Sequence, residues 1–397
     1  MQGTSSALSF LRLTLIEGVG PVLGRRLIDA FGSPDHVFTA SPADLERIDR
    51  IGPAKARRIH ASLLNSAEAL EKEVQLAERL GVRIIALNDP DYPPLLAQAP
   101  DAPLVLYVRG STPCPAETYP VAIVGSRHCT AYGVEQAERF SAALAQQGLV
   151  IVSGGARGVD SAAHRAAIRV QGKTVVIMGC GLANCYPPEN NELFADITAR
   201  GGSVISELPL ATTPSTDTFP ARNRIIAAMS LGVIVIEAPK GSGALITARV
   251  AIDDYNREVM AVPGRIDSRA SEGSNELIRS GSAAMVTTPA DAIEILESAA
   301  RHHHDGTHAD RYRPPLPPGA VAEPAPRETN PPPKALAELT ATDTQRAILA
   351  ALREPASINE ICRTTGLEPA IVQAETTVLE IRRVILREGS KFRTRNS

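Results

Sequence analysis

The sequence predicts an α/β protein with a doubly wound, mostly parallel sheet, a helical domain before it and a winged-helix domain after it. From residue 121 onward, short apolar runs alternate with helical patterns, as they do in parallel sheets covered on both faces. Helical patterns with Gly turns precede this part, and a Pro-rich stretch follows it. A chain of 397 residues is too long for one ordinary core, so several domains are expected.

Residues 1–80 are expected to form a helical domain of the helix-hairpin-helix (SAM-like) kind. Gly18, Gly20 and Pro21 end one helix and begin the next within a few residues. A weaker copy lies at 48–53, where Arg50 replaces the first Gly. Such turns hold a DNA phosphate on exposed N–H groups in some proteins and only pack helices in others, and the sequence leaves both interpretations open.

Residues 81–300 are expected to carry the sheet. Short strands at 82–87 and 104–108 precede the regular part. Its strands are expected at 121–124, 149–152, 174–178, 203–205, 233–236 and 258–262. Helices are expected between most of them, at 132–146, 161–170, 190–200, 222–229 and 244–252. Ligands of such sheets bind outside the carboxyl ends of the strands, so the residues after each strand are the informative ones.

Gly turns with Arg or Lys recur at these strand ends, a pattern typical of phosphate binding. The expected rim carries the cations Arg127, Arg157, Arg222, Arg224 and Lys240. The Gly-rich turn at 239–243 leads from a strand into a helix, whose N-terminal N–H groups favour an anion.

Phe219 stands beside the basic cluster on this rim, where an aromatic ring can stack on a nucleotide base. It precedes Pro220, which favours an extended backbone outside the helix that follows. The alternative is a Phe that fills the domain core, since Phe is often fully buried.

Composition narrows the function further. The formal net charge of −3 indicates that any polyanion site is a local patch. Five scattered Cys without a C-x-x-C pair predict no zinc site and a reducing cytoplasm. The sequence has no run of 18 apolar residues, so no membrane-spanning segment is expected. It also has no G-x-G-x-x-G motif, so no dinucleotide cofactor is expected. No metal, cofactor or catalytic residue is expected.

A set of motifs in this region resembles the DprA/Smf family. The motifs are GSR at 125–127, SGGARGVD at 153–160, GCGLANCYPPEN at 179–190, FPARNRIIAAMS at 219–230, GSGALITA at 241–248, VPG at 262–264 and GSNELI at 273–278. The resemblance implies an extended Rossmann-like domain that binds and protects single-stranded DNA and helps to load the RecA recombinase onto it in natural transformation and recombination. Members have no known catalytic activity and typically form homodimers through this domain.

The resemblance also implies roles for particular residues. Phosphates would be held by Arg127, the turn after the second regular strand, Arg222, Arg224 and Lys240, and Phe219 would contact a base. The DNA-binding residues expected from rim and resemblance together are Gly125, Ser126, Arg127, Ser153, Gly154, Gly155, Arg157, Phe219, Arg222, Asn223, Arg224, Lys240, Gly241, Ser242 and Gly243.

A second hypothesis is a nucleotide-handling hydrolase, like the Rossmann-type phosphoribohydrolases that resemble lysine decarboxylase homologues. Those enzymes carry a PGG-x-GT loop followed by paired Glu residues. Here the loop reads PKGSG at 239–243, and Ala244 and Leu245 stand where acids would be needed.

Residues 301–338 are rich in Pro and are expected to be a linker. Residues 339–397 are expected to form a winged-helix domain, with helices at 344–352, 358–364 and 370–381 and a strand pair around Gly389. Winged helices serve both as DNA contacts and as protein contacts, and the sequence leaves both open.

Overall fold

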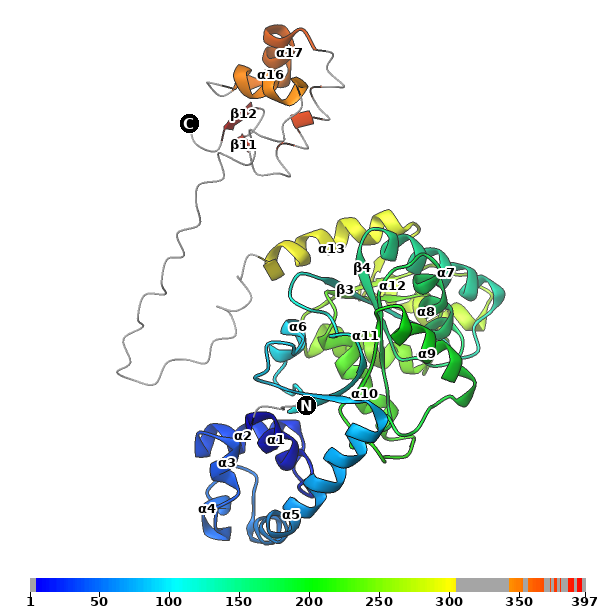
Figure 1. The fold of residues 1–397 in the computed structure, drawn as a ribbon. Helices are drawn as coiled ribbons and strands as arrows, with labels where there is room; N and C mark the ends of the chain where they lie inside the picture. Colours follow the sequence, from blue (N-terminus) through cyan, green and yellow to red (C-terminus); the bar gives the residue numbers. More distant parts are fainter. Residues whose placement is uncertain are drawn as a thin grey trace. The chain divides into compact units, whose positions relative to one another are not determined.

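The computed structural model describes residues 5–304, 343–352, 356–367, 372, 375–376, 379, 385–388 and 391–394. The chain divides into two compact units, Met1–Pro314 and Pro315–Ser397 (Figure 1). None of the described helices combines the length and the apolar character that a membrane crossing requires.

A mostly parallel sheet forms the centre of the first unit. Within residues 5–304 it has nine strands, in the order β1-β2-β6-β5-β4-β3-β7-β8-β9. They are β1 Arg83–Ala86, β2 Val105–Gly110, β3 Tyr119–Val124, β4 Leu149–Ser153, β5 Thr174–Ile177, β6 Ser203–Ser206, β7 Gly232–Val235, β8 Glu258–Ala261 and β9 Ala284–Met285. Strands β3 to β9 pair in parallel, while β1 and β2 add an antiparallel edge.

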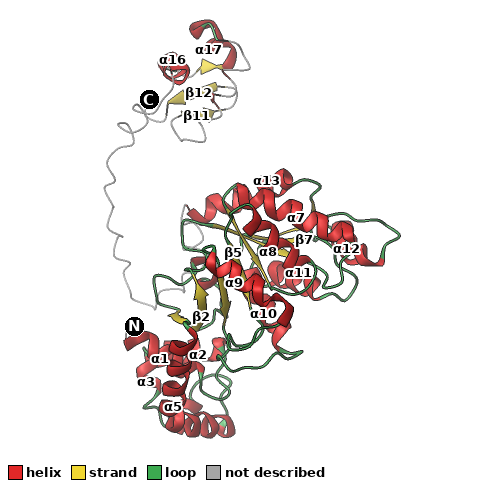
Figure 2. Ribbon diagram, turned by 45° about the vertical axis from the view of Figure 1, so that its right-hand side comes forward, coloured by secondary structure: helices red, strands yellow, loops and turns green. Residues whose placement is uncertain are grey.

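Helices cover both faces of this sheet, as Figure 2 shows. On one face, α7 (Ala131–Gln146), α8 (Val159–Arg169) and α13 (Pro289–His304) share a hydrophobic core with the sheet. On the other face, α10 (Thr218–Ala228) and α11 (Gly243–Asp253) do so. The shorter elements are α6 Pro94–Ala97, η1 Pro188–Asn190, α9 Asn191–Ala199, η2 Arg269–Ser271 and α12 Glu272–Arg279.

The strand order reverses between β3 and β7, which are neighbours although α7 and three further strands separate them in sequence. From this pair the chain builds outward in both directions, first through β4, β5 and β6, then through β8 and β9. The carboxyl ends of β3 and β7 therefore flank the switch point, where open α/β sheets bind ligands.

The N-terminal helices are packed directly on the sheet. They are α1 Ser5–Thr14, α2 Pro21–Phe31, α3 Pro34–Val37, α4 Pro42–Glu46 and α5 Pro53–Leu80. Leu11 and Leu27 belong to the same hydrophobic core as Leu104 on the sheet side. The buried Glu73 carboxylate on α5 accepts the backbone N–H of Leu210 at 2.7 Å. The helices and the sheet thus share one core across the expected boundary at residue 80.

The predicted turns of the helical region are present. Gly18 has a φ of 79°, in the left-handed region that glycine favours, and α2 begins at Pro21. Arg50 adopts a φ of 64° in the weaker copy, and α5 begins at Pro53. Helix α5 runs through 28 residues, because no Gly or Pro follows Pro53 to interrupt it.

Two differences from the sequence prediction concern the end of the first unit. The two-residue strand β9 and the helices α12 and α13 were not predicted. Helix α13 continues to His304, past the expected start of the linker at residue 301. The rest of the expected linker lies outside the described residues.

The second unit has the elements of a winged helix in its described part. They are α16 Asp343–Ala351, β10 Ala356–Ser357, α17 Ile358–Thr365, β11 Ile385–Glu388 and β12 Lys391–Thr394. The strands pair in the order β10-β12-β11, and the residues of a small core include Ile348, Ile361 and Phe392. The helix expected at 370–381 falls mostly outside the described residues.

Candidate nucleic-acid interface

The parallel strands bring most of the predicted site residues to one edge of the sheet. Gly125, Ser126 and Arg127 follow β3, and Ser153 ends β4 and leads into 154–158. The turn at 239–243 follows β7 and leads into α11. Because β4, β3 and β7 are consecutive strands, all three segments adjoin the switch point.

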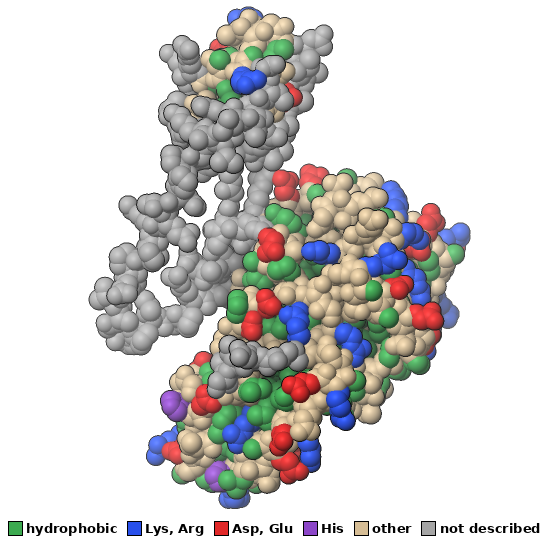
Figure 3. Space-filling view, viewed as in Figure 1, with side chains coloured by type: hydrophobic (Ala, Val, Ile, Leu, Met, Phe, Trp, Pro, Cys, Tyr) green, Lys and Arg blue, Asp and Glu red, His purple; other side chains and the backbone are tan. Residues whose placement is uncertain are grey.

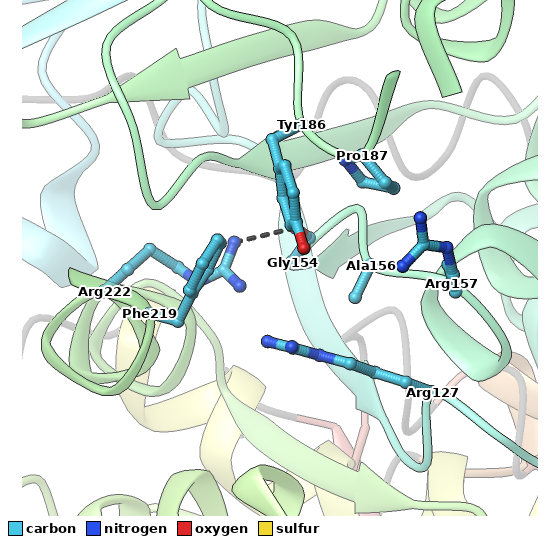
Figure 4. A pocket seen from close by; sticks show the side chains of 8 residues that line it. All are labelled: Arg127, Gly154, Ala156, Arg157, Tyr186, Pro187, Phe219 and Arg222. Atoms are coloured by element: carbon cyan, nitrogen blue, oxygen red, sulfur yellow. Dashed lines mark hydrogen bonds between the residues drawn. The ribbon is translucent and has the colours of Figure 1, made fainter. Parts of the chain in front are cut away.

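A small open pocket lies at this edge, and we call it the edge pocket (Figure 4). It is lined by Arg127, Gly154, Ala156, Arg157, Tyr186, Pro187, Phe219 and Arg222.

Aromatic rings and a guanidinium group meet in the edge pocket. The guanidinium carbon of Arg127 lies 5.1 Å from the centroid of the Phe219 ring. The centroids of Phe219 and Tyr186 are 5.3 Å apart, with the rings tilted by 43°. Figure 4 shows these three side chains converging on the same space. The arrangement offers π surfaces for a base beside a cation for a phosphate.

Arg127 is exposed, and its charge is available to a ligand. No ion pair within residues 5–304 involves it. Arg157, on the other side of the pocket, pairs with Glu189, and both side chains are about half exposed. An exposed pair of this kind contributes little stability, so an incoming phosphate can compete for Arg157 at small cost.

Phe219 lies in the first turn of α10, which begins at Thr218, so the expected extended backbone is wrong. Pro220 fits there because the first N–H groups of a helix have no intrahelical partner. The ring is half-buried and rests on Gly179, where an added Cβ would lie 2.7 Å from the Phe219 Cδ1 atom. The ring faces the edge pocket rather than filling the domain core.

Arg222 forms the floor of the edge pocket and is 5% exposed. Its Nη1 donates to the Gly154 carbonyl at 2.7 Å and to the Ile177 carbonyl. Burial lowers the pKa of Arg222 to about 10, against the effect of nearby Asp160. The sequence predicts a phosphate contact for Arg222, and in the structure its hydrogen bonds tie α10 to the ends of β4 and β5.

Arg224, for which the sequence predicts a phosphate contact, does not line the edge pocket. Its guanidinium pairs with Glu207, donates to the Asp101 carbonyl at 2.8 Å, and lies 3.5 Å from the Asp101 carboxylate. The side chain is 16% exposed and lines a different pocket, near Pro21 of the helical region. Burial raises the pKa of Glu207, and the positive charge of Arg224 opposes this. Two partly buried carboxylates thus already balance the positive charge of Arg224.

Lys240 and the turn after β7 lie on the edge but outside the edge pocket. The Lys240 side chain is exposed, and Gly241 has a φ of 75° that favours glycine. Ser242 caps α11 by accepting the Ala244 N–H at 3.2 Å. Asn223 donates to the Gly243 carbonyl at 3.3 Å and joins this turn to α10. The turn is therefore held in place and presents Lys240 to solvent.

Other predicted residues shape the loops. The Ser153 hydroxyl donates to the Ile123 carbonyl at 2.6 Å, and the Ser126 N–H donates to the Glu237 carbonyl at 2.7 Å. Gly125 and Gly154 leave no room for a side chain, and Gly155 has a φ of 65°. These residues let the backbone of the neighbouring strand ends pack closely around the pocket.

Tyr186 lines the pocket but is absent from the site residues predicted from the sequence. Its signal was its position after β5, one strand away from the Gly-rich turn after β4. Pro187 and Ala156 likewise line the pocket without having been predicted. Ordinary residue types in loops carry no chemical signature, and only the fold brings them together.

The edge is a local site on a surface of mixed charge. On the face seen in Figure 3, Lys and Arg side chains lie among Asp and Glu side chains. No cluster of His, Cys, Asp and Glu among the described residues could hold a metal ion. Both oxygens of Glu237 accept hydrogen bonds from Thr130, while Glu207 pairs with Arg224. These two acids are therefore engaged separately and do not face one another as a hydrolytic pair would.

Comparisons with known proteins agree with the motif resemblance. Residues 83–297 match the model of the DNA recombination-mediator protein A family, residues 10–63 a SAM-like helix-hairpin-helix tandem, and residues 329–390 a DprA winged-helix domain. The chain is 33% identical over 404 residues to protein Smf of Synechocystis, covering 97% of this chain and 98% of that one. It is 37% identical over 247 residues to protein Smf of Escherichia coli, covering 62% and 65% of the two chains.

A solved structure shows the same fold. The X-ray structure of DNA processing protein A from Streptococcus pneumoniae has a TM-score of 0.63 and 32% sequence identity, and the match covers 74% of this chain and 98% of that chain. The predicted DprA/Smf resemblance and fold class are confirmed, and the phosphoribohydrolase hypothesis is not favoured.

Proposed function

Because the chain belongs to the DNA recombination-mediator protein A (DprA/Smf) family, we propose that it binds and protects single-stranded DNA and helps to load the RecA recombinase onto it. The process served is natural transformation and DNA recombination. The protein acts as a binder and not as an enzyme.

The observation that carries the DNA-binding proposal is the contact of Arg127 with Phe219 in the edge pocket. The Arg127 charge is 5.1 Å from the ring centroid, and the ring has a second aromatic neighbour in Tyr186. Proteins that bind single strands combine cations along the backbone with rings on which bases stack. Arg127 and Phe219 supply both elements within one nucleotide unit of each other.

The DNA strand runs along the carboxyl edge in this proposal. One base stacks on Phe219, and phosphates lie against Arg127, Arg157 and Lys240. Cations and π surfaces recognise features that every nucleotide shares, so binding tolerates any sequence. Arg222 and the Gly turns hold this surface in shape, and they contribute by positioning.

Two further parts of the proposal rest on family membership. The chain forms a homodimer through the Rossmann-like domain, and it contacts the RecA recombinase directly. Sedimentation velocity tests the first, with a mass of one subunit at all concentrations as the contradicting result. Pull-down of purified RecA, followed by a strand-exchange assay on coated DNA, tests the second.

Fluorescence anisotropy of a labelled oligo-dT tests DNA binding. We expect affinity to fall on Arg127→Ala, and the slope of log K against log salt to become shallower by roughly 0.7. Arg200→Ala is the matched control, because Arg200 is exposed and follows α9 at the opposite edge of the sheet. An equal loss in both variants, or in neither, would contradict the proposed site.

A further inference from the structure

The loop after β8 presents one isoleucine almost entirely to solvent at the edge that carries the edge pocket. Ile266 is 98% exposed, whereas the other exposed large hydrophobic residues of the described chain range from 37% to 72%. It occupies the tip of a turn that the Ser268 N–H closes on the Arg265 carbonyl at 3.2 Å.

This exposure belongs to a loop that is tied down at its base. Tyr132 of α7 donates its hydroxyl proton to the Pro263 carbonyl at 2.7 Å. Asn275 of α12 accepts the Gly264 N–H at 3.0 Å and donates to the Gly264 carbonyl at 3.1 Å. Gly264 also packs so closely on Ser271 that an added Cβ would lie 2.0 Å from the Ser271 hydroxyl oxygen. The fold therefore holds the isoleucine outward.

The loop lies in line with the proposed strand path. In the sheet β4, β3, β7 and β8 are consecutive, so their carboxyl ends carry Gly154, Arg127, Lys240 and Ile266 in that order. Neighbouring strands are about 4.8 Å apart, which puts the ends of β4 and β8 about 14 Å from one another. A single strand that enters the edge pocket reaches the loop after β8 within a few nucleotides.

We propose that Ile266 is a second base contact, an aliphatic side chain against which a nucleotide of the bound single strand packs beyond the edge pocket. The inference rests on the proposed function. Aliphatic side chains are used in this way elsewhere, as wedges between the bases of a bent duplex.

The size of the apolar surface favours a base over a protein partner. A stable protein interface buries roughly 800 Å² on each side, with several apolar residues at its centre. Ile266 instead stands between Arg265 and Asp267, which bond to one another at 2.8 Å and 3.0 Å. One apolar side chain with polar neighbours is too small to form the apolar centre of such an interface.

The chain contains no Trp, so an Ile266→Trp variant carries a single fluorescent reporter at the loop tip. We expect its emission to be quenched when oligo-dT is added, because a base stacks on the indole. The control is Ile252→Trp, at a position that is 37% exposed near the end of α11, away from this edge. Its emission should stay constant while anisotropy reports the same binding.

Length dependence separates the two contacts. Ile266→Ala should weaken binding of a long oligo-dT by roughly fivefold to tenfold and leave the shortest bound oligo-dT unaffected. Phe219→Ala should weaken binding at every length.

The outcomes distinguish failure of this inference from failure of the proposed function. Absence of DNA binding by the parent chain refutes both. Binding that depends on Phe219, with an Ile266→Trp emission that DNA does not change, refutes the second base contact alone. An emission that changes with protein concentration and not with DNA also refutes it, and assigns Ile266 to a contact between subunits.

Discussion

Arg222 and Arg224 are two residues apart on α10, and their guanidinium groups lie on different sides of that helix. Arg222 donates to the Gly154 carbonyl at 2.7 Å beneath the edge pocket, whereas Arg224 pairs with Glu207 and Asp101. Residues two apart on a helix point in nearly opposite directions, so one ligand cannot contact both from the same side. The basic cluster of the sequence is therefore divided in the fold.

Arg224→Ala should destabilise the protein and leave the salt dependence of DNA binding unchanged. Its removal leaves Glu207 and Asp101 without their cation, and breaking a buried pair costs about 3–5 kcal/mol. Calorimetry should show the lower Tm, and anisotropy well below that Tm should show the parent slope. Adding Glu207→Gln to Arg224→Ala should restore part of the stability. A Tm equal to that of the parent chain, together with a shallower salt slope, would show that Arg224 contacts a DNA phosphate.

Lys240→Ala should flatten the salt slope by roughly 0.7, and the effect should add to that of Arg127→Ala. Lys240 is exposed on a turn whose backbone the Ser242 cap and Asn223 hold, so its loss removes charge without disturbing the fold. Lys240→Arg is the control, since it keeps the charge and should keep the slope. Anisotropy between low and moderate salt measures both, and a slope like that of the parent chain would place the strand elsewhere.

Phe219→Ala should weaken DNA binding by about 1–3 kcal/mol and hardly move the Tm. The ring is half-buried against Gly179 and turned toward the edge pocket, so little core volume is lost. Phe140→Ala is the contrasting variant, because Phe140 is 0% exposed and its loss should cost about 3–5 kcal/mol of stability. If Phe219→Ala behaved like Phe140→Ala, the ring would belong to the core.

His164 should make the first unit less stable in acid. Its Nδ1 lies 2.7 Å from the Thr174 hydroxyl oxygen, whose proton goes to the Ile151 carbonyl at 2.7 Å. Nδ1 is thus the donor, and Nε2 has no hydrogen-bond partner among the described residues. Burial lowers the pKa of His164 to about 3, and Arg222 and Arg165 act in the same direction.

Between about pH 6.5 and 3 the unfolded chain binds a proton at His164 that the folded chain does not bind. The free energy of unfolding therefore falls as the pH falls through this window, by about 2 kcal/mol at pH 5. His164→Gln lacks this titration, so calorimetry from pH 8 to pH 5 should show the parent chain losing about 2 kcal/mol more than the variant. Equal losses in the two proteins would exclude His164 as the source.

The sheet was predictable to within one or two residues per regular strand, because buried parallel strands are short continuous apolar runs. The position of the site at the carboxyl ends of the strands was also predictable, because strand ends and Gly turns are visible in short stretches of sequence. The carboxylate that pairs with each arginine could not be predicted from the sequence. Asp101 is more than a hundred residues from Arg224 in sequence, and Glu207 lies in a different loop. No local sequence pattern indicates that either carboxylate pairs with Arg224.

Phe219 illustrates a second limit. The residue before a proline usually avoids the helical region, yet Pro220 sits in the first turn of α10, where a missing N–H costs nothing. The preference of Phe219 for an extended backbone was overridden, because helix α10 begins at Thr218, before Phe219. Tyr186 illustrates a third limit, since a tyrosine after a strand becomes a site residue only through its contact with a ring more than thirty positions away.

The shared core of helices and sheet limits how this protein can diverge. Gly24 of α2 lies against Leu104, where an added Cβ would stand 2.4 Å from the Leu104 Cδ1 atom. A larger residue at Gly24 therefore needs either a shift of the Leu104 side chain or a smaller residue at 104. A chimera that joins the helices of one relative to the sheet of another is expected to fit best when both positions come from the same parent.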